Sequence, residues 1–166
     1  MCGKETGGFA SAEAGLFNGS PFAWCRLERS SERAIQLADE FTAVLGAYPL
    51  WLSPETHDRW VAATSHLPYL LAIALAAATP LEAAPLVGPG FHSAARLAGS
   101  PPEVMLDILL TNREQILVAA GRFQERLRTL IALLEGSTDS KDSGLSDCLQ
   151  AGRQNRRKLL EPEFLP

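Results

Sequence analysis

The apolar run at residues 67–78, LPYLLAIALAAA, constrains the fold of this 166-residue chain more than any other feature. Residues 53–55, Ser-Pro-Glu, supply an N-cap, a proline for the first helical position and an acidic first turn. We therefore expect one helix from this point to about Thr79. Its second half is apolar on every face, so this half must be surrounded by protein.

Pro68 is expected to bend this helix. Proline has no amide hydrogen and its ring crowds the preceding turn, which predicts a kink beside Ser65 and His66. The twelve-residue apolar run is shorter than the roughly 20 residues that a membrane-spanning helix needs. No membrane segment is predicted, and the first residues, MCGKETGG, lack the pattern of a secretory signal.

Composition narrows the choice of partners and compartment. Fifteen Lys and Arg oppose 19 Asp and Glu, which gives a net charge of -4. A nucleic-acid-binding surface is basic, so no nucleic-acid partner is expected. Cys2, Cys25 and Cys148 are odd in number and widely spaced, which predicts neither a disulfide framework nor a zinc ribbon. A reducing, cytoplasmic location is expected.

Periodicity and turn residues predict a mainly α chain with one or two short N-terminal strands. Before the central helix we expect a helical stretch at 10–17 and two strands at 21–27 and 48–52. A helix that Ser30 or Ser31 caps and Gly46 ends lies between the strands. After the central helix we expect a loop at 79–90, a short helix at 91–98, a long helix at 102–134, a hinge at 136–143 and a terminal helix at 145–160.

The predicted long helix carries apolar residues at spacings of three and four from Met105 to Leu134. At 1.5 Å per residue, this helix is on the order of 50 Å long. The other helices of one chain are too short to cover it, and it would otherwise expose a large apolar patch. We therefore expect a homodimer.

The histidines do not predict a metal site. His57 and His66 are nine residues apart, about 180° around a straight helix, so their side chains are expected on opposite faces. His92 lies in a different predicted element. No metal ligand set is therefore assigned.

Several residues fit either a structural or a functional role. His57 and Asp58 lie in the first turn of a helix, where Asp58 can favour the helix dipole or take part in chemistry. His66 can be a hydrogen-bonded core residue or, beside a helix irregularity, can contact a ligand. Arg96 lies among small, nearly uncharged residues; it is either a solvated surface arginine or a fork for a carboxylate.

Seven short motifs follow one another along the first 134 residues. They are Gly3-Lys4-Glu5-x-x-Gly8, Ala14-Gly15-Leu16-Phe17, Leu45-Gly46-Ala47, Ser53-Pro54-Glu55-x-His57-Asp58, Ser65-His66-Leu67-Pro68, Gly90-Phe91 and Arg96-Leu97-Ala98-x-Ser100. In this order they resemble the C-terminal domain of prephenate dehydrogenases of tyrosine biosynthesis. The most specific part is the His-Asp pair at its spacing from Ser-His-Leu-Pro.

This resemblance implies a helical dimerisation domain of the 6-phosphogluconate dehydrogenase C-terminal type, which closes over a dinucleotide held by a Rossmann domain. It implies NAD- or NADP-dependent oxidative decarboxylation of prephenate or arogenate. The sequence has no G-x-G-x-x-G phosphate cradle, so no cofactor is expected on this chain alone. Residues 1–135 are expected to form the substrate-binding and dimerisation domain, and 136–166 its hinge and C-terminal helix. The N-terminal Rossmann domain is expected to be absent, or supplied by an upstream segment or a separate chain.

The resemblance also implies site residues. Arg96 matches the family's substrate-carboxylate arginine, and Ser65 and His66 match the motif that lines the cleft. Tyr69 departs from the pattern, because prephenate-specific members often have a second histidine there; the choice between prephenate and arogenate stays open. The family's catalytic histidine belongs to a His-Pro-Met-x-Gly motif, and the chain begins at the Met of that motif. We therefore expect that histidine just before Met1, and no activity from this chain alone.

A function of a different class remains open. The chain could be a stand-alone helical dimeric module that binds a partner or senses a small ligand without catalysis. Such a module has no need to begin within a catalytic motif, which favours the dehydrogenase interpretation.

Overall fold

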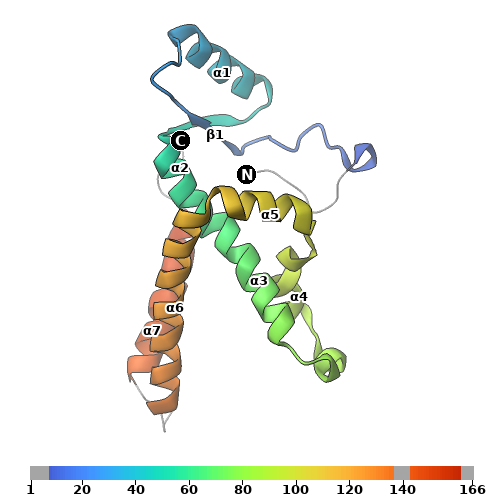
Figure 1. Cartoon of the computed structure of the whole chain (residues 1–166), viewed down its shortest axis with the longest axis vertical. Coiled ribbons are helices and arrows are strands. Elements are labelled where there is room, and N and C mark those ends of the chain that lie inside the picture. The colour runs from blue at the N-terminus through green and yellow to red at the C-terminus, as the bar shows by residue number, and fades with distance from the viewer. Residues whose placement is uncertain (1–7, 137–142, 162–166) are drawn as a thin grey trace. The chain divides into compact units, whose positions relative to one another are not determined.

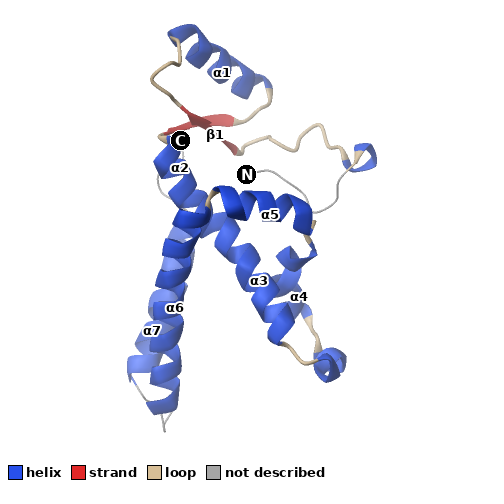
Figure 2. Cartoon of the chain, in the orientation of Figure 1, coloured by secondary structure: helices blue, strands red, loops and turns tan. Residues whose placement is uncertain are grey.

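The structure is a computed structural model of the chain, and it describes residues 8–136 and 143–161. These residues are mainly helical with two short strands (Figure 2), which confirms the predicted fold class. The elements, labelled as in Figure 1, are η1 (Phe9–Ser11), β1 (Pro21–Cys25), α1 (Glu32–Val44), β2 (Tyr48–Leu52), α2 (Pro54–Val61), η2 (Ala62–His66), α3 (Leu67–Ala78), η3 (Leu81–Leu86), α4 (Pro89–Ala95), η4 (Arg96–Gly99), α5 (Pro102–Thr111), α6 (Arg113–Gly136) and α7 (Ser143–Leu160). The chain divides into two compact units, Met1–Ala119 and Ala120–Pro166.

The first unit opens with a β-α-β arrangement. Strands β1 and β2 pair in parallel, from Pro21 opposite Tyr48 to Cys25 opposite Leu52, and α1 connects them. Ser31 caps α1, since its side chain accepts a hydrogen bond from the amide of the third helical residue. The predicted strands and the predicted helix are confirmed, with the first strand two residues shorter than expected.

Aromatic rings fill the space between α1 and the strands. Thr42 of α1 is fully buried; its hydroxyl donates to the carbonyl of Ala38 at 2.7 Å and accepts from Trp24 Nε1 at 2.8 Å. The neighbouring rings that contact one another are Phe17, Phe22, Trp24, Phe41 and Trp51. Thr42 therefore ties the helix to the strand beneath these rings.

The segment before β1 contradicts the prediction of a helix at 10–17. Only the short 3-10 turn Phe9–Ser11 forms, and turns follow it to Gly19. Gly19 has a φ of 65°, a left-handed conformation that a regular helix does not contain. Gly15 within the stretch lowers helix propensity further, by about 1 kcal/mol relative to alanine.

The predicted helix from residue 54 to about 79 is continuous but changes register. Ser53 caps α2 by accepting from the amide of Thr56. The turn η2 (Ala62–His66) is π-helical, and the amide of Leu67 bonds the carbonyl of Ala62, five residues earlier. A π-turn skips one backbone hydrogen bond, and Pro68 has none to give. The expected kink therefore takes the form of one wide turn.

The helix α3 is not enclosed within one chain. It packs against η4 and α4, yet only 22% of the most apolar 18-residue window in Pro54–Ala78 is buried. By length and composition alone, Pro54–Ala78 is apolar enough to cross a membrane. The helix is thus longer than the twelve-residue run on which the expectation of no membrane segment was based. The core helix of a soluble protein passes the same test, so the feature does not by itself indicate a membrane protein.

The predicted single helix at 102–134 is wrong, because Asn112 divides it. Asn112 has φ -107° and ψ 27°, outside the helical region. Its amide donates to the carbonyl of Ile108, and its carbonyl accepts from the amide of Ile116. One residue thus ends α5 and begins α6.

The remaining elements agree with the sequence in part. The loop at 79–90 contains the 3-10 segment η3, and the predicted short helix is divided into α4 and η4. The terminal helix is confirmed as α7. The predicted hinge at 136–143 lies mostly outside the described residues.

The substitution Thr42→Val tests the buried contact beneath the aromatic rings. Valine has nearly the same volume but cannot accept from Trp24 Nε1, so a part-buried donor loses its partner. We expect the free energy of unfolding in urea, at fixed protein concentration, to fall by about 1 to 3 kcal/mol. Thr129→Val is the matched control, since Thr129 makes the same bond to a carbonyl four residues earlier on an exposed surface. Equal losses in both variants would contradict a role for the Trp24 contact.

Candidate functional site

Most candidate residues lie on one continuous helical segment. His57 and Asp58 belong to α2, Ser65 and His66 to the π-turn η2, and Tyr69 to α3. Tyr69 is buried, Ser65, His57 and His66 are half-buried, and Asp58 is exposed. His57 Nδ1 lies 3.0 Å from Asp58 Oδ1.

The π-turn corrects the expected orientation of the two histidines. A straight helix would place His57 and His66 about 180° apart. Because the π-turn takes up one extra residue, the rotation between them is that of eight α-helical residues, about 80°. His57 and Asp58 accordingly both act electrostatically on His66.

Asn112 joins this segment from the α5–α6 junction. Its Nδ2 donates to the backbone carbonyl of Asp58 at 2.8 Å and lies 3.3 Å from His66 Nδ1. These contacts connect residues 54 and 46 positions apart in the sequence. A single amide therefore contacts both α2, before the π-turn, and His66, the last residue of that turn.

The surroundings of His66 favour its neutral form. Loss of solvation lowers the pKa of the imidazole below its ordinary value, the Asp58 carboxylate opposes this shift, and His57 adds to it. Burial outweighs the carboxylate because Asp58 is exposed to water, which screens its charge. The lowered pKa therefore favours the neutral imidazole over the imidazolium.

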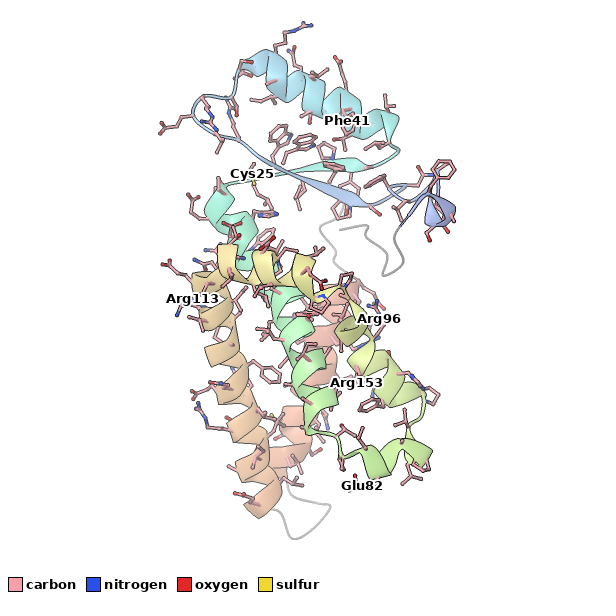
Figure 3. The ribbon with its side chains drawn as sticks, turned by 45° about the vertical axis from the view of Figure 1, so that its right-hand side comes forward. Cys25, Phe41, Glu82, Arg96, Arg113 and Arg153 are labelled. Atoms are coloured by element: carbon pink, nitrogen blue, oxygen red, sulfur yellow. The ribbon has the colours of Figure 1, made fainter. Side chains whose placement is uncertain are left out.

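Arg96 occupies a neighbouring element. It is the first residue of η4, which packs against α3 (Figure 3). Arg96 is exposed in this chain. The structure thus places Arg96 on an element that packs against α3, the helix that carries Tyr69, and outside the cluster that Asn112 connects.

A polar groove of about 410 Å³ lies between the start of α2 and the α5–α6 junction. Glu55 and Asp58 line one side, and Asn112 and Arg113 line the other. Hydrogen bonds from its own backbone amide and from Ser53 lower the pKa of Glu55. The groove therefore combines carboxylates with a guanidinium, and it opens directly beside Asn112.

Cys25 lies where β1 meets α2 (Figure 3). Burial raises the pKa of its thiol, and the negative charges of Asp58 and Glu55 raise it further. Cys25 is thus a protonated, weakly nucleophilic thiol at neutral pH. The described residues contain no group of three or more His, Cys, Asp or Glu side chains that could hold a metal ion.

Sequence reasoning missed Asn112 as a site residue. Its spacing fits the apolar series from Met105 to Leu134, so periodicity assigns it only a place on a helix. The available signal was its amide, the single strongly polar side chain in a series otherwise built from apolar residues. The position of Cys25 beside Asp58 had no signal, because it depends on how β1 meets α2.

Comparison with known proteins identifies the family of the larger part of the chain. The family model described as the prephenate dehydrogenase dimerization domain matches residues 53–151. The prephenate dehydrogenase of Bacillus subtilis (strain 168) is 29% identical over 137 residues, covering 78% of this chain and 36% of the relative. The cyclohexadienyl dehydrogenase of Zymomonas mobilis is 28% identical over 148 residues, covering 82% and 50%.

Solved structures show the same fold. A prephenate dehydrogenase from A. aeolicus, in complex with hydroxyphenyl propionate and NAD+, superimposes with a TM-score of 0.85 at 24% identity, covering 96% of this chain and 57% of that chain. Synechocystis arogenate dehydrogenase gives a TM-score of 0.78 at 25% identity, covering 95% and 58%. The chain therefore spans a little over half of these solved chains, and half or less of the two curated relatives.

The thiol of Cys25 reports on the charges beside it. In a chain carrying Cys2→Ser and Cys148→Ser, we expect iodoacetamide to alkylate Cys25 more slowly than a free thiol at pH 8, because its raised pKa leaves less thiolate. Adding Asp58→Asn removes a negative charge, lowers that pKa and speeds the reaction. Asp107→Asn, on the exposed surface of α5, is the control with no expected effect. An unchanged rate in the Asp58 variant would show that this carboxylate does not act on the thiol.

Proposed function

Because this chain belongs to the family of prephenate dehydrogenase dimerization domains, we propose that it forms the substrate-binding and dimerising half of a prephenate or arogenate dehydrogenase. The complete enzyme is a cytoplasmic oxidoreductase that oxidatively decarboxylates its substrate with NAD or NADP. The observation that carries this proposal is the family match over residues 53–151, which includes every candidate residue from His57 to Arg96. Cys25 and Cys148 are free thiols, which supports a reducing compartment.

The candidate residues supply the interactions that such a substrate needs. Prephenate has two carboxylates and a ring hydroxyl, and a carboxylate held away from water needs a cationic or hydrogen-bonding partner. We assign this role to the Arg96 guanidinium, with the hydroxyls of Ser65 and Tyr69 and the imidazole of His66 as further contacts. Tyr69 brings no charge, which is why the proposal covers both substrates.

The cofactor is assigned to another domain. The sequence contains no glycine-rich phosphate cradle, so the residues of this chain do not fit a dinucleotide. The A. aeolicus relative in complex with NAD+ supports a nicotinamide cofactor for the complete enzyme.

The β-α-β arrangement is proposed as the contact with that nucleotide-binding domain. A parallel sheet of two strands is too small to be stable alone, and parallel sheets are normally covered on both faces. On α1, Leu37, Phe41 and Val44 follow a helical spacing and are 61%, 49% and 85% exposed. The family match begins at Ser53, directly after β2. This supports assigning β1, α1 and β2 to the nucleotide-binding half rather than to the predicted domain 1–135.

Homodimerisation is proposed for the long helices. Large apolar side chains on these helices are widely exposed in the single chain, and soluble proteins rarely leave so much apolar surface uncovered. The residues concerned are Val104, Leu106 and Leu110 of α5 and Leu117, Val118, Leu127, Ile131 and Leu134 of α6. A second copy supplies a matching apolar surface by symmetry.

Sedimentation tests the dimer. We expect this chain to sediment as a dimer at micromolar concentration. Leu117→Glu or Leu134→Glu should shift it toward the monomer, because each leucine is more than half exposed in the single chain, 59% and 65%, and would become a buried charge only in the interface. Arg126→Glu places a negative charge on the exposed side of α6 opposite Leu117, nine residues away, and should leave the dimer intact. A monomeric wild-type chain would refute the proposal.

A turnover assay, combined with substitutions of Arg96, tests the enzymatic assignment. We expect the chain alone to be inactive, and its fusion to the nucleotide-binding part of the B. subtilis relative to form NADH or NADPH with prephenate or arogenate. In that fusion, Arg96→Ala should raise KM roughly 30-fold to 1000-fold, equivalent to about 2 to 4 kcal/mol, while folding and cofactor affinity are kept. Arg96→Lys should recover only part of the loss, because an ammonium lacks the two-pronged geometry.

Two results would contradict these assignments. Turnover by the chain alone would show that it holds its own cofactor site and catalytic base. Wild-type kinetics in the Arg96→Ala fusion would show that the substrate carboxylate is held elsewhere, with Tyr69 and His66 as the next residues to test.

A further inference from the structure

The side-chain nitrogen of Asn112, Nδ2, lies within hydrogen-bond distance of two acceptors. Nδ2 carries two hydrogens; one is directed to the carbonyl of Asp58 at 2.8 Å, and His66 Nδ1 lies 3.3 Å from the same nitrogen. If the amide were turned over, its oxygen would face the carbonyl oxygen of Asp58, and both atoms would be acceptors. Hydrogen-bond complementarity therefore fixes the orientation of Asn112.

This orientation determines where the imidazole carries its proton. Nδ2 has only hydrogens to offer, so His66 Nδ1 can bond it only as an acceptor. In neutral histidine, the other ring nitrogen then carries the hydrogen. Among the described residues, His66 Nε2 has no hydrogen-bond partner. The ring thus presents an unused N–H group.

We propose that Asn112 is a positioning residue that holds His66 as its Nε2–H tautomer, so that His66 offers the ligand a hydrogen-bond donor and not a base. The identity of the ligand rests on the proposed function, in which the acceptor is a carboxylate or hydroxyl oxygen of the substrate. The tautomer itself rests only on the contacts of Asn112.

The groups that face His66 are consistent with this role. Burial lowers the pKa of His66, and the two charged or titratable neighbours that act on it, Asp58 and His57, oppose each other. A protonated ring would need a hydrogen on Nδ1, directed at the hydrogens of Asn112. The same contact that selects the tautomer therefore also disfavours the imidazolium.

A purely structural role for Asn112 predicts a different outcome. Its bond to the Asp58 carbonyl alone would anchor the α5–α6 junction to α2, and any variant would then change stability without changing the ring. The protonated nitrogen of His66 is the readout that separates the two roles, because a structural anchor does not determine it.

Nitrogen NMR of the full chain with isotope-labelled histidine measures this tautomer. At about pH 8, above the ordinary histidine pKa, we expect His66 to show a protonated Nε2 and an unprotonated Nδ1; His66→Gln identifies its signals among the three histidines. Asn112→Asp places an acceptor at Nδ1 and should move the proton to that nitrogen and raise the pKa. Asn155→Asp, the same change on an exposed position of α7, should leave His66 unchanged.

The result that overturns the proposal needs no variant. If wild-type His66 carries its hydrogen on Nδ1, the proposal is wrong even if the Asn112 variants do not fold. A folded Asn112→Asp chain with an unchanged tautomer also overturns it.

The fusion protein separates this inference from the proposed function. There, Asn112→Asp should raise KM roughly 10-fold to 100-fold, the loss expected for one hydrogen bond to a charged group, with less change in kcat. If the NMR results are as expected but the fusion oxidises neither substrate, the positioning role stands and the proposed function fails. If the fusion is active but Asn112→Asp changes neither KM nor the tautomer, the proposed function stands and the positioning role of Asn112 fails.

Discussion

The wide turn at Ala62–His66 is the constraint on which the rest of the site depends. An α-helical turn would carry the side chains after it around to another face; the extra residue of the π-turn brings His66 back toward the side of Asp58. The π-turn loses little at Pro68, because proline has no amide hydrogen and could not make the regular α-helical hydrogen bond there. Asn112 then contacts Asp58 before the turn and His66 at its last position.

The same chain leaves many of its large apolar side chains exposed. The helix α3 has the composition of a core helix but is mostly uncovered, and α1 presents large apolar side chains that stay about half exposed or more. These surfaces lie in different parts of the chain, and the proposals above give them different partners: a second copy for the long helices, and an α/β domain for the strands. Under these proposals folding stability depends on association, since whatever binds only the native state stabilises it.

Local signals in the sequence predicted the elements that have clear beginnings and ends. Ser31 and Ser53 cap their helices as expected, and the strand Tyr48–Leu52 has the predicted bounds. The break at Asn112 could not be predicted from periodicity, because the spacing of three and four continues through it on both sides. The π-turn could not be predicted either. A proline predicts a bend, but the direction of the side chains after the bend depends on which carbonyl accepts the hydrogen bond of the next amide. The sequence therefore placed the candidate residues on the correct helical segment but did not predict their mutual orientation.

Asn112 illustrates why a site of this kind depends on residue type and not on polarity alone. Asparagine at a helix start usually accepts from the first free amides with its side-chain oxygen; here the Nδ2 group of the same amide is directed to Asp58 and His66. Aspartate has no hydrogens to give, serine has one, and lysine would bring a charge with a large desolvation cost. A primary amide is the neutral group that donates twice from one atom. With His66 held as a donor, and with the hydroxyls of Ser65 and Tyr69 also able to donate, the proposed site matches a ligand rich in oxygen acceptors.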